Sequence, residues 1–251
     1  MKWIASLAAG LVFAGAAVAQ NAPAAPEAAI PTYITASLAL PMRGDDVYDD
    51  SRREIAQIMA FSEVKAGDTV LELVPGSGYW SKVFSAIVGP MGKVYLAVPT
   101  PMEKYSEATK SLPSRLANTQ LLLQPADALS APTPVDVVFT SQNYHDYPLS
   151  FMGPTDPAVL NKAVFDMLNP GGVYIIIDHA AQDGSGLRDA DSLHRIDPQL
   201  VRQQVEAAGF EFVGQSDALS NPVDDRTLSV FNDEIRGYTD QFIYKFRKPA
   251  Q

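Results

Sequence analysis

The segment 69–88 constrains the fold more than any other part of the sequence. Residues 69–74 form a short apolar run with β-branched side chains, which is typical of a buried parallel strand. The turn Pro-Gly-Ser-Gly at residues 75–78 interrupts this run, and apolar residues then recur at helical spacing over residues 79–88. Glycines let the backbone approach a ligand closely, and a helix N-terminus offers unpaired N–H groups. With Glu72 near the strand's end, able to accept hydrogen bonds from a sugar or an amine, this unit favours nucleotide-type binding over an ordinary connecting turn.

Strands and helices alternate along the rest of the chain. We expect further strands at residues 93–98, 119–124, 135–140, 173–177, 211–215 and 241–247, and helices at residues 101–110, 157–168 and 198–208. Such alternation indicates a parallel sheet with helices on both faces, and the two closely spaced late strands predict an antiparallel pairing at one edge. The chain has 251 residues, 47% of them hydrophobic, which suits one α/β domain with a full core. The long connections at residues 180–196 and 217–239 are expected to cover the site.

The N-terminus has the pattern of an export signal. Lys2 precedes an apolar stretch at residues 3–16 that is too short for a stable membrane anchor, and residues 17–19 read Ala-Val-Ala, an A-x-A cleavage signal. We therefore predict a signal peptide at residues 1–19 and a periplasmic or secreted protein that is free of the membrane after cleavage. Because the sequence has no cysteine, it can form neither a disulfide nor a lipid-modified cysteine.

The predicted mature chain is acidic. The full sequence has a formal net charge of −10, and removal of Lys2 with the signal peptide brings it to −11. Nucleic-acid binding usually requires a basic patch, so we expect no nucleic-acid partner and a small-molecule substrate instead.

The segment between the signal and the domain is expected to be loosely organised. Residues 20–48 form an Ala/Pro-rich linker followed by an irregular lead-in, and the domain itself is expected to span residues 49–251. The sequence Asp-Asp-Ser at residues 49–51 is suited to cap a helix over residues 52–61. Two arginines, Arg52 and Arg53, begin this helix, and a solvated surface pair and a functional pair are equally good interpretations of them.

Polar residues follow the predicted strands at the edge where ligands bind in open α/β sheets. These residues are Glu72, Gly76 and Gly78 after the first strand, Asp127 after the third, Asn143, Tyr144, His145 and Asp146 after the fourth, and Asp178, His179, His194 and Arg195 at and beyond the fifth. All three histidines of the chain belong to this set, and His145 and His179 are candidate general bases near neutral pH.

Two further points limit the chemistry of this edge. Asp146 follows His145 and Asp178 precedes His179, but neighbours on a strand face opposite ways, so neither pair is automatically a pair of partners. Histidines and carboxylates together could bind a metal, but the sequence has no compact His-x-x-x-His spacing, so we expect no metal site. There is also no Gly-x-Ser-x-Gly elbow and no phosphate-binding P-loop.

Several motifs together resemble a known family. The sequence Glu-Leu-Val-Pro-Gly-Ser-Gly at residues 72–78 resembles the first motif of class I S-adenosylmethionine-dependent methyltransferases, and Leu-Asn-Pro-Gly-Gly at residues 168–172 resembles their turn before the fifth strand. The motifs Arg52-Arg-Glu, Pro75-Gly-Ser-Gly-Tyr79, Asn143-Tyr-His-Asp146, Asp178-His179, His194-Arg-Ile-Asp197 and Glu206-Ala-Ala-Gly-Phe210 resemble a group of exported bacterial proteins labelled predicted methyltransferases. The resemblance covers about residues 49–249.

The resemblance implies a Rossmann-like sheet of seven strands in the order 3-2-1-4-5-7-6, with the last strand antiparallel and helices on both faces. It implies S-adenosylmethionine as cofactor, with these residues in binding roles: Glu72, Gly76, Gly78, Tyr79, Asp127 and Asn143. It places these residues in the catalytic group: His145, His179, Asp146 and His194. The chain departs from the family pattern at two positions. Val74 stands where the first glycine of the motif is usual, and Pro99 follows Val98 where an acidic residue usually ends the second strand.

Three hypotheses follow from these observations. The first is a methyltransferase in which His145 or His179 removes a proton from a small-molecule acceptor. The second, motivated by the export signal and the two departures, is an enzyme that has kept the fold, lost the cofactor, and uses the histidines for lyase or isomerase chemistry. The third is a periplasmic protein that binds a small molecule without turning it over.

Overall fold

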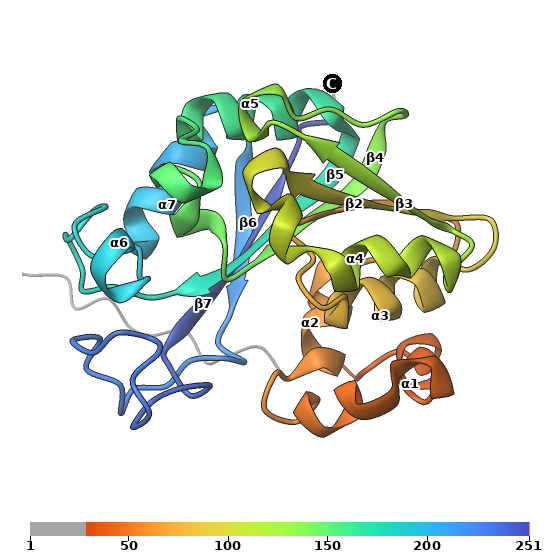
Figure 1. Ribbon diagram of the computed structural model, residues 1–251, viewed down its shortest axis with the longest axis horizontal. Coiled ribbons are helices and arrows are strands. Elements are labelled where there is room, and N and C mark those ends of the chain that lie inside the picture. The colour runs from red at the N-terminus through yellow and green to blue at the C-terminus, as the bar shows by residue number, and fades with distance from the viewer. Residues whose placement is uncertain (1–28, 251) are drawn as a thin grey trace, which may run out of the picture.

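A computed structural model of the protein describes residues 29–250 (Figure 1). The predicted signal peptide and the start of the Ala/Pro-rich linker lie outside the described residues. The strands are β1 Thr69–Leu73, β2 Lys93–Pro99, β3 Thr119–Gln124, β4 Val135–Ser141, β5 Leu168–His179, β6 Glu211–Ser216 and β7 Gln241–Arg247. The α-helices are α1 Thr32–Leu38, α2 Ile55–Ser62, α3 Tyr79–Val88, α4 Glu107–Ser111, α5 Pro157–Met167, α6 Ala190–Leu193 and α7 Pro198–Ala207. Short 3-10 segments occupy Pro41–Asp49, Thr100–Tyr105, Leu112–Ser114, Ala126–Ala128, Tyr144–Asp146 and Ser150–Met152.

The seven strands form one sheet in the order β3-β2-β1-β4-β5-β7-β6, as predicted. The first five strands run parallel, and β7 pairs antiparallel with both β5 and β6. The strand order reverses between β1 and β4, which is the place where open α/β sheets bind ligands beyond their carboxyl ends. A ligand site is therefore expected beyond the carboxyl ends of β1, β4 and β5.

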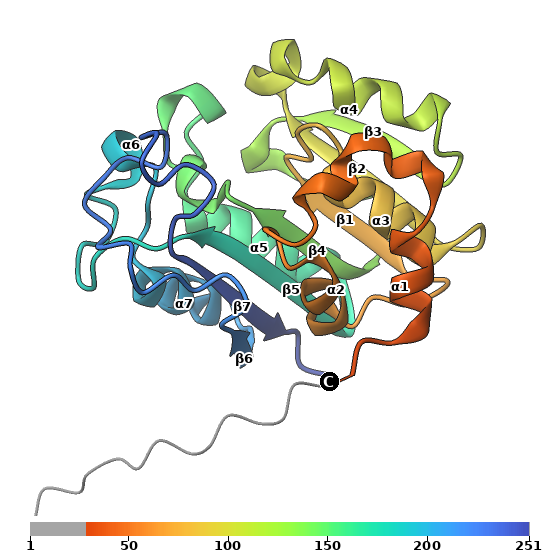
Figure 2. The same ribbon diagram turned by 90° about the horizontal axis from the view of Figure 1, so that it is seen from below.

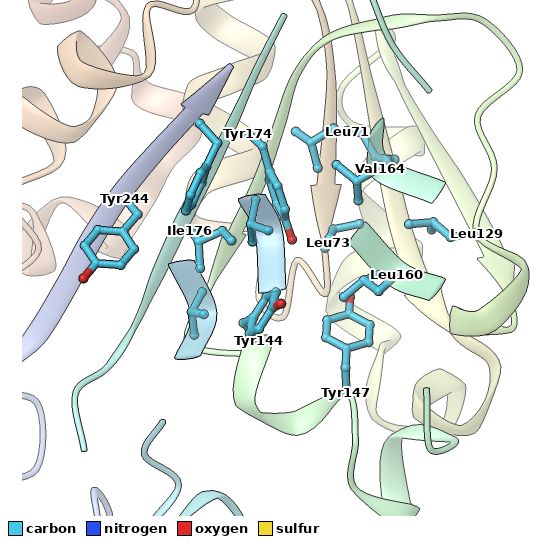
Figure 3. Close-up of a cluster of buried hydrophobic side chains, with 14 of the residues drawn as sticks. Leu71, Leu73, Leu129, Tyr144, Tyr147, Leu160, Val164, Tyr174, Ile176 and Tyr244 are labelled. Carbon is cyan, nitrogen blue, oxygen red and sulfur yellow. The ribbon is translucent and has the colours of Figure 1, made fainter. Parts of the chain in front are cut away.

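Alternating side chains of the central strands build a core on each face of the sheet. On one face, Leu71 and Leu73 of β1 and Ile176 of β5 pack with Leu160 and Val164 of α5 (Figure 3). The opposite face is formed by the intervening residues of the strands and is covered by α1, α2 and α3 (Figure 2). Because both faces of the sheet are buried, its central strands have continuous apolar sequences. These runs are the reason that the strand positions could be predicted from the sequence.

Local signals set the starts of the helices that cover the first face. Asp156 caps α5 by accepting a hydrogen bond from the N–H of Ala158 at 2.8 Å, and Asp197 caps α7 by accepting one from the N–H of Gln199 at 2.9 Å. In each case a proline follows the cap, and its fixed φ suits the first helical position. Among residues 29–250, no helix is both long and apolar enough to cross a bilayer.

The N-terminal part of the described chain differs from the prediction. The expected irregular lead-in is helical, and Ile34 of α1 is fully buried against the core that α3 covers. The helix expected from residue 52 begins instead at Ile55, because Glu54 adopts a left-handed conformation with φ of 44°. The acidic residues expected to cap it form other bonds: Asp49 pairs with Arg52 and Asp50 pairs with Arg43.

The helix expected at residues 101–110 is also interrupted. A 3-10 segment, Thr100–Tyr105, precedes α4, and Ser106 between them has φ of −107°. The Ser106 hydroxyl donates a hydrogen bond to the carbonyl of Met102 at 2.8 Å, a local bond of the kind that competes with regular helix.

Candidate active site

The glycine turn after β1 opens on a cavity of about 330 Å³. Its wall includes the end of β1 from Glu72 to Val74, the turn residues Pro75 to Ser77, and the residues that follow β4. Val74 has φ of 51°, a left-handed conformation that a β-branched residue rarely adopts. The chain thus makes the turn with valine at the position where glycine is usual. A cavity of this size falls within the range of small-ligand sites.

Glu72 is the acidic group of this first cavity. It is 1% exposed, and the Ser81 hydroxyl of α3 donates a hydrogen bond to its carboxyl group. Burial disfavours the charged form and raises the pKa of Glu72 to about 8, although the hydrogen bond from Ser81 acts in the opposite direction. Glu72 is therefore a carboxyl group that exchanges a proton near neutral pH, at the end of the central strand.

Arg53 is the basic group of the same cavity. Its guanidinium lies over the ring of Tyr79, 4.4 Å from the centroid, and 5.9 Å from the ring centroid of Trp80. Its buried Nε has no hydrogen-bond partner among the described residues. The segment that carries Arg53 is fixed by Asp50, which accepts hydrogen bonds from Arg43 and, at 2.8 Å, from the Tyr79 hydroxyl. Stacking thus holds the Arg53 guanidinium in the cavity wall.

A second cavity of about 510 Å³ adjoins the first, and the two share Arg53 and Gln142 in their walls. Arg52 and Arg236 also line the second cavity, and none of the described residues in its wall is acidic. Asp49 outside the wall pairs with Arg52 at 2.8 Å, so only part of this positive charge is neutralised nearby. In a chain with a net charge of −10, this cavity is a local basic site.

His179, the last residue of β5, lines the second cavity. Its Nδ1 lies 2.7 Å from the Thr239 hydroxyl, so Nε2 is the ring nitrogen left for a ligand. Burial lowers the pKa of His179 to about 4, although the nearby Asp178 carboxylate acts to raise it. The imidazole is therefore neutral at physiological pH.

His145 lies in the 3-10 segment Tyr144–Asp146 that follows β4, and it is held by Asp178 of β5. One carboxylate oxygen of Asp178 lies 2.8 Å from His145 Nδ1, and the other accepts the His145 backbone N–H at 2.9 Å. Burial by itself lowers the pKa of His145, but the carboxylates of Asp178 and Asp146 outweigh it and raise that pKa to about 10. His194, from the loop after β5, places its Nδ1 3.2 Å from His145 Nε2.

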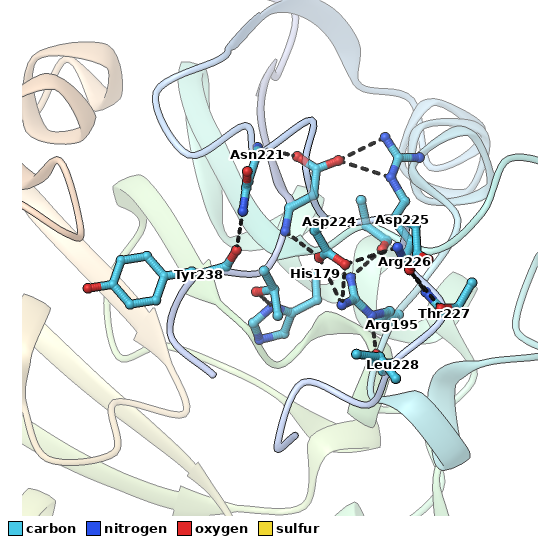
Figure 4. Close-up of polar contacts among 12 residues, drawn as sticks. His179, Arg195, Asn221, Asp224, Asp225, Arg226, Thr227, Leu228 and Tyr238 are labelled. Carbon is cyan, nitrogen blue, oxygen red and sulfur yellow. Dashed lines mark hydrogen bonds and ion pairs between the residues drawn. The ribbon is translucent and has the colours of Figure 1, made fainter. Parts of the chain in front are cut away.

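Of the two long connections expected to cover the site, the one at residues 217–240 lines the second cavity, and the one after β5 places His194 against Phe231 of that cavity. The loop at residues 217–240 supplies Val230, Phe231 and Arg236 to the second cavity. A buried ion pair of 2.8 Å between Arg195 and Asp224 joins this loop to the loop that follows β5 (Figure 4). These loops are therefore anchored by buried charges in addition to apolar contacts.

The structure separates the sequence-predicted site residues into three groups. The first cavity is lined by Glu72, Gly76, Tyr79 and Asn143; the histidine cluster contains His145, Asp146 and His194; and His179 stands in the second cavity. Gly78 and Asp127 line neither cavity.

The positions of Gly78 and Asp127 have simple physical reasons. Gly78 has φ of 83° and packs against Leu112, where an added Cβ would lie only 2.6 Å from a methyl group, so both the backbone conformation and the packing require glycine. Asp127 is exposed in the 3-10 segment Ala126–Ala128, which turns away after β3.

Sequence reasoning missed Gln142 and Arg236 and left Arg53 undecided. Gln142 directly follows β4 and has φ of 61°, and its position at a strand end is the signal that was available. Arg236 lies far from any motif in the sequence, so only the path of the loop at residues 217–240 brings it to the cavity.

Comparison with known proteins supports the fold. No protein-family model matches the sequence, and no curated protein matches it. Solved structures do match. A SAM-dependent methyltransferase from Aquifex aeolicus aligns with a TM-score of 0.56 at 18% identity over 86% of this chain and 97% of that one. The N-methyltransferase NodS from Bradyrhizobium japonicum aligns with a TM-score of 0.56 at 14% identity over 80% and 99% of the two chains. The cyclase SpnF aligns with a TM-score of 0.60 at 15% identity over 80% and 81%.

These likenesses show the fold. The chain has the Rossmann-like methyltransferase fold, and it is structurally similar to class I SAM-dependent methyltransferases.

Proposed function

We propose that this protein is an S-adenosylmethionine-dependent methyltransferase that acts on a small molecule carrying an anionic group. The observation that carries the proposal is the pair of adjoining cavities with the shared residues Arg53 and Gln142. Methyl transfer needs a cofactor and an acceptor bound side by side, and two cavities with a common wall supply that arrangement. The location at the switch point of a methyltransferase fold agrees with it.

The residues of the first cavity fit the amino-acid end of the cofactor. The Arg53 guanidinium in the cavity wall suits a carboxylate, and Glu72 suits an ammonium group, whose positive charge favours the ionised carboxylate. Gly76 faces open space where an added Cβ would meet no atom within 4 Å, so the turn leaves room on the cavity side. When bound, the cofactor supplies an electrophilic methyl group on a sulfonium ion.

The second cavity fits an acceptor with a carboxylate or phosphate group. Arg52, Arg53 and Arg236 provide positive charge, and guanidinium groups recognise both anions through paired N–H donors. His179 lines the same cavity, and when its Nδ1 donates to Thr239 its Nε2 is the ring nitrogen that can accept a proton from the acceptor. The acceptor is thus bound by arginines and deprotonated by a histidine of this chain.

A second function has an observation in its favour. The wall of the first cavity contains no acidic residue from the end of β2, and Asp127 is exposed outside it, so the described residues offer no carboxylate for a ribose or an adenine amine at that end. A cyclase shares the fold, so the fold does not require methyl transfer. The alternative is a cofactor-free enzyme that uses His179 for lyase or isomerase proton transfer.

Calorimetric titration with S-adenosylmethionine tests the proposal. We expect saturable binding to one site, and Arg53→Met should weaken that binding by about 10-fold to 100-fold, the loss of one hydrogen bond to a charged group. The exposed Arg115→Met is the matched control and should bind like the unmodified protein.

The absence of binding at about 1 mM cofactor, the upper end of ordinary Michaelis constants, would overturn the proposal. In that case turnover of a screened substrate that is lost in His179→Ala would support the cofactor-free enzyme. A tightly held copurifying molecule without turnover would indicate a binding protein.

The predicted export of the protein remains part of the proposal. Mass spectrometry of the protein recovered from its native host should find Gln20 at the N-terminus. An intact Met1 would contradict the predicted cleavage after Ala19.

A further inference from the structure

Two histidines and one aspartate converge beside the second cavity. His145 Nε2 lies 3.0 Å from Asp146 Oδ1 and 3.2 Å from His194 Nδ1, and the third separation, from His194 Nδ1 to Asp146 Oδ1, is 3.5 Å. Each of these atoms can offer a lone pair to a cation when its residue is not protonated there. The three residues come from two loops that are 49 positions apart at their histidines.

Asp178 fixes the orientation of one of these ligands. It accepts a hydrogen bond from the Nδ1–H of His145 at 2.8 Å, which leaves Nε2 facing the other two atoms. Asp178 is completely buried, and its oxygens also accept the backbone N–H groups of His145 and His179. A carboxylate behind a histidine is the usual second layer of a protein metal site, where it sets the tautomer and raises the basicity of the ligand.

Two observations on the other two members of the cluster favour a bound cation. Asp146 is 8% exposed, and its Oδ1 has no hydrogen-bond partner within residues 29–250. His194 has φ of 53°, a left-handed conformation that is unfavourable for a non-glycine residue. A buried carboxylate oxygen that has two imidazole nitrogens within 3.5 Å but no well-directed hydrogen bond, together with a left-handed histidine beside it, favours a cation that would interact with both residues at once.

The separations match a metal coordination shell. Donor atoms at 2.0–2.1 Å from a tetrahedral Zn²⁺ lie about 3.3 Å from one another, and the three observed separations are close to this value. We propose that His145 Nε2, Asp146 Oδ1 and His194 Nδ1 bind a divalent transition-metal ion of the Zn²⁺ type. Imidazole and carboxylate donors suit such ions, and three protein ligands leave at least one coordination position open.

The position of the site relative to the cavity gives the metal access to solvent or a ligand. The His194 side chain is 25% exposed, and its ring packs edge-on against Phe231, with 4.8 Å between centroids. Phe231 lines the second cavity, so the metal site and the proposed acceptor site are separated by one side chain. The metal site is argued from its own residues and does not depend on methyl transfer.

Titration of the chelator-treated protein with Zn²⁺, followed by calorimetry, tests the inference without any assay of activity. We expect one equivalent of Zn²⁺ to bind. His194→Asn should weaken binding at least about 100-fold, because loss of a ligand costs at least as much as loss of a second-layer partner. Asparagine is chosen because it tolerates the left-handed backbone of this position. Asp178→Asn should weaken binding by about 10-fold to 100-fold.

His179→Asn is the matched control. The His179 ring lies 6.2 Å from that of His145 but its Nδ1 bonds Thr239, so Zn²⁺ binding should be unchanged. The circular dichroism spectrum of each variant shows that it is folded. The inference is overturned if the unmodified protein binds no Zn²⁺, because a proton alone then accounts for the cluster. It is also overturned if His194→Asn binds as tightly as His179→Asn.

Discussion

Asp178 Oδ1 lies 2.8 Å from His145 Nδ1, which ties the end of β5 to the turn that follows β4. The second oxygen of the same carboxylate accepts the His145 backbone N–H at 2.9 Å, and Oδ1 also accepts the N–H of His179. One buried side chain therefore satisfies three donors from two neighbouring strand ends. Asp178 therefore positions both His145 of the cluster and His179 of the second cavity.

Asp178→Asn should lower the free energy of unfolding by about 1.5–3 kcal/mol, the contribution of hydrogen bonds to a charged group. The amide has one acceptor oxygen and places an N–H₂ group against donors that are completely buried. Urea unfolding at pH 7 measures the change. Asp166→Asn is the matched control, because Asp166 pairs with Lys162 at the surface and such pairs contribute less than about 1 kcal/mol. Equal effects of the two substitutions would contradict the role of Asp178.

Glu72→Gln should change how stability depends on pH. The folded-state pKa of Glu72 is about 8 and its ordinary value is 4.5, so between these values the native state keeps a proton that the unfolded chain has lost. Stability therefore falls as pH rises from about 4.5 to 8, and glutamine removes this fall. We expect similar stability at pH 5, and a variant more stable at pH 9 by roughly 3–5 kcal/mol, at about 1.4 kcal/mol for each pKa unit. Parallel stability curves would refute this assignment.

Glu72→Gln also tests the proposed cofactor site. If Glu72 receives the ammonium group, the variant should lose about 1–3 kcal/mol of S-adenosylmethionine binding free energy, the usual loss for a hydrogen bond to a charged group. Calorimetry at pH 8 provides the measurement. A variant with unchanged cofactor affinity and a clearly lower melting temperature would show that Glu72 has a structural role through Ser81.

Val74→Gly should be more stable than Val74→Ala by about 1 kcal/mol. Both substitutions remove the two γ-methyl groups, but only glycine adopts φ of 51° without the penalty that a Cβ brings to the left-handed region. The control is Val164 in the interior of α5, where alanine should be the more stable replacement by about 0.5–1 kcal/mol. Thermal unfolding of the four variants gives both differences. The same order at both positions would show that Val74 is not strained.

Arg195→Met should destabilise the fold by about 3–5 kcal/mol, because it leaves the Asp224 carboxylate buried and unpaired. Both side chains of this pair are almost completely buried, with exposures of 0% and 1%. Arg188→Met is the control, since Arg188 is mostly exposed beside Asp189 and should change stability by less than about 1 kcal/mol. Amide hydrogen exchange should show that residues 217–240 open first in Arg195→Met. Uniform loss of protection across the sheet would instead place the effect in the core.

Strand and helix positions could be predicted from the sequence because the central strands are buried on both faces. The run at residues 173–177 is apolar for this reason. The strand and the helix within residues 69–88 are predicted by an apolar run followed by apolar residues at helical spacing. The strand order came from the resemblance of several motifs, and the observed order agrees with it. The helix start at Ile55 was missed because the expected capping carboxylates bind Arg43, Arg52 and Tyr79, and these pairings depend on tertiary contacts.

The sequence alone determined that all three histidines lie at one edge of the sheet, because the carboxyl ends of the parallel strands meet there and each histidine lies at or beyond such an end. Only the tertiary structure decided how the residues at that edge are grouped. It placed His179 in the wall of the basic cavity and brought His145 and His194, which are 49 residues apart, to within 3.2 Å of each other. The physical reason is that strand pairing is recorded in local hydrophobic patterns, whereas the path of a long loop is set by buried contacts between distant residues, such as Arg195 and Asp224.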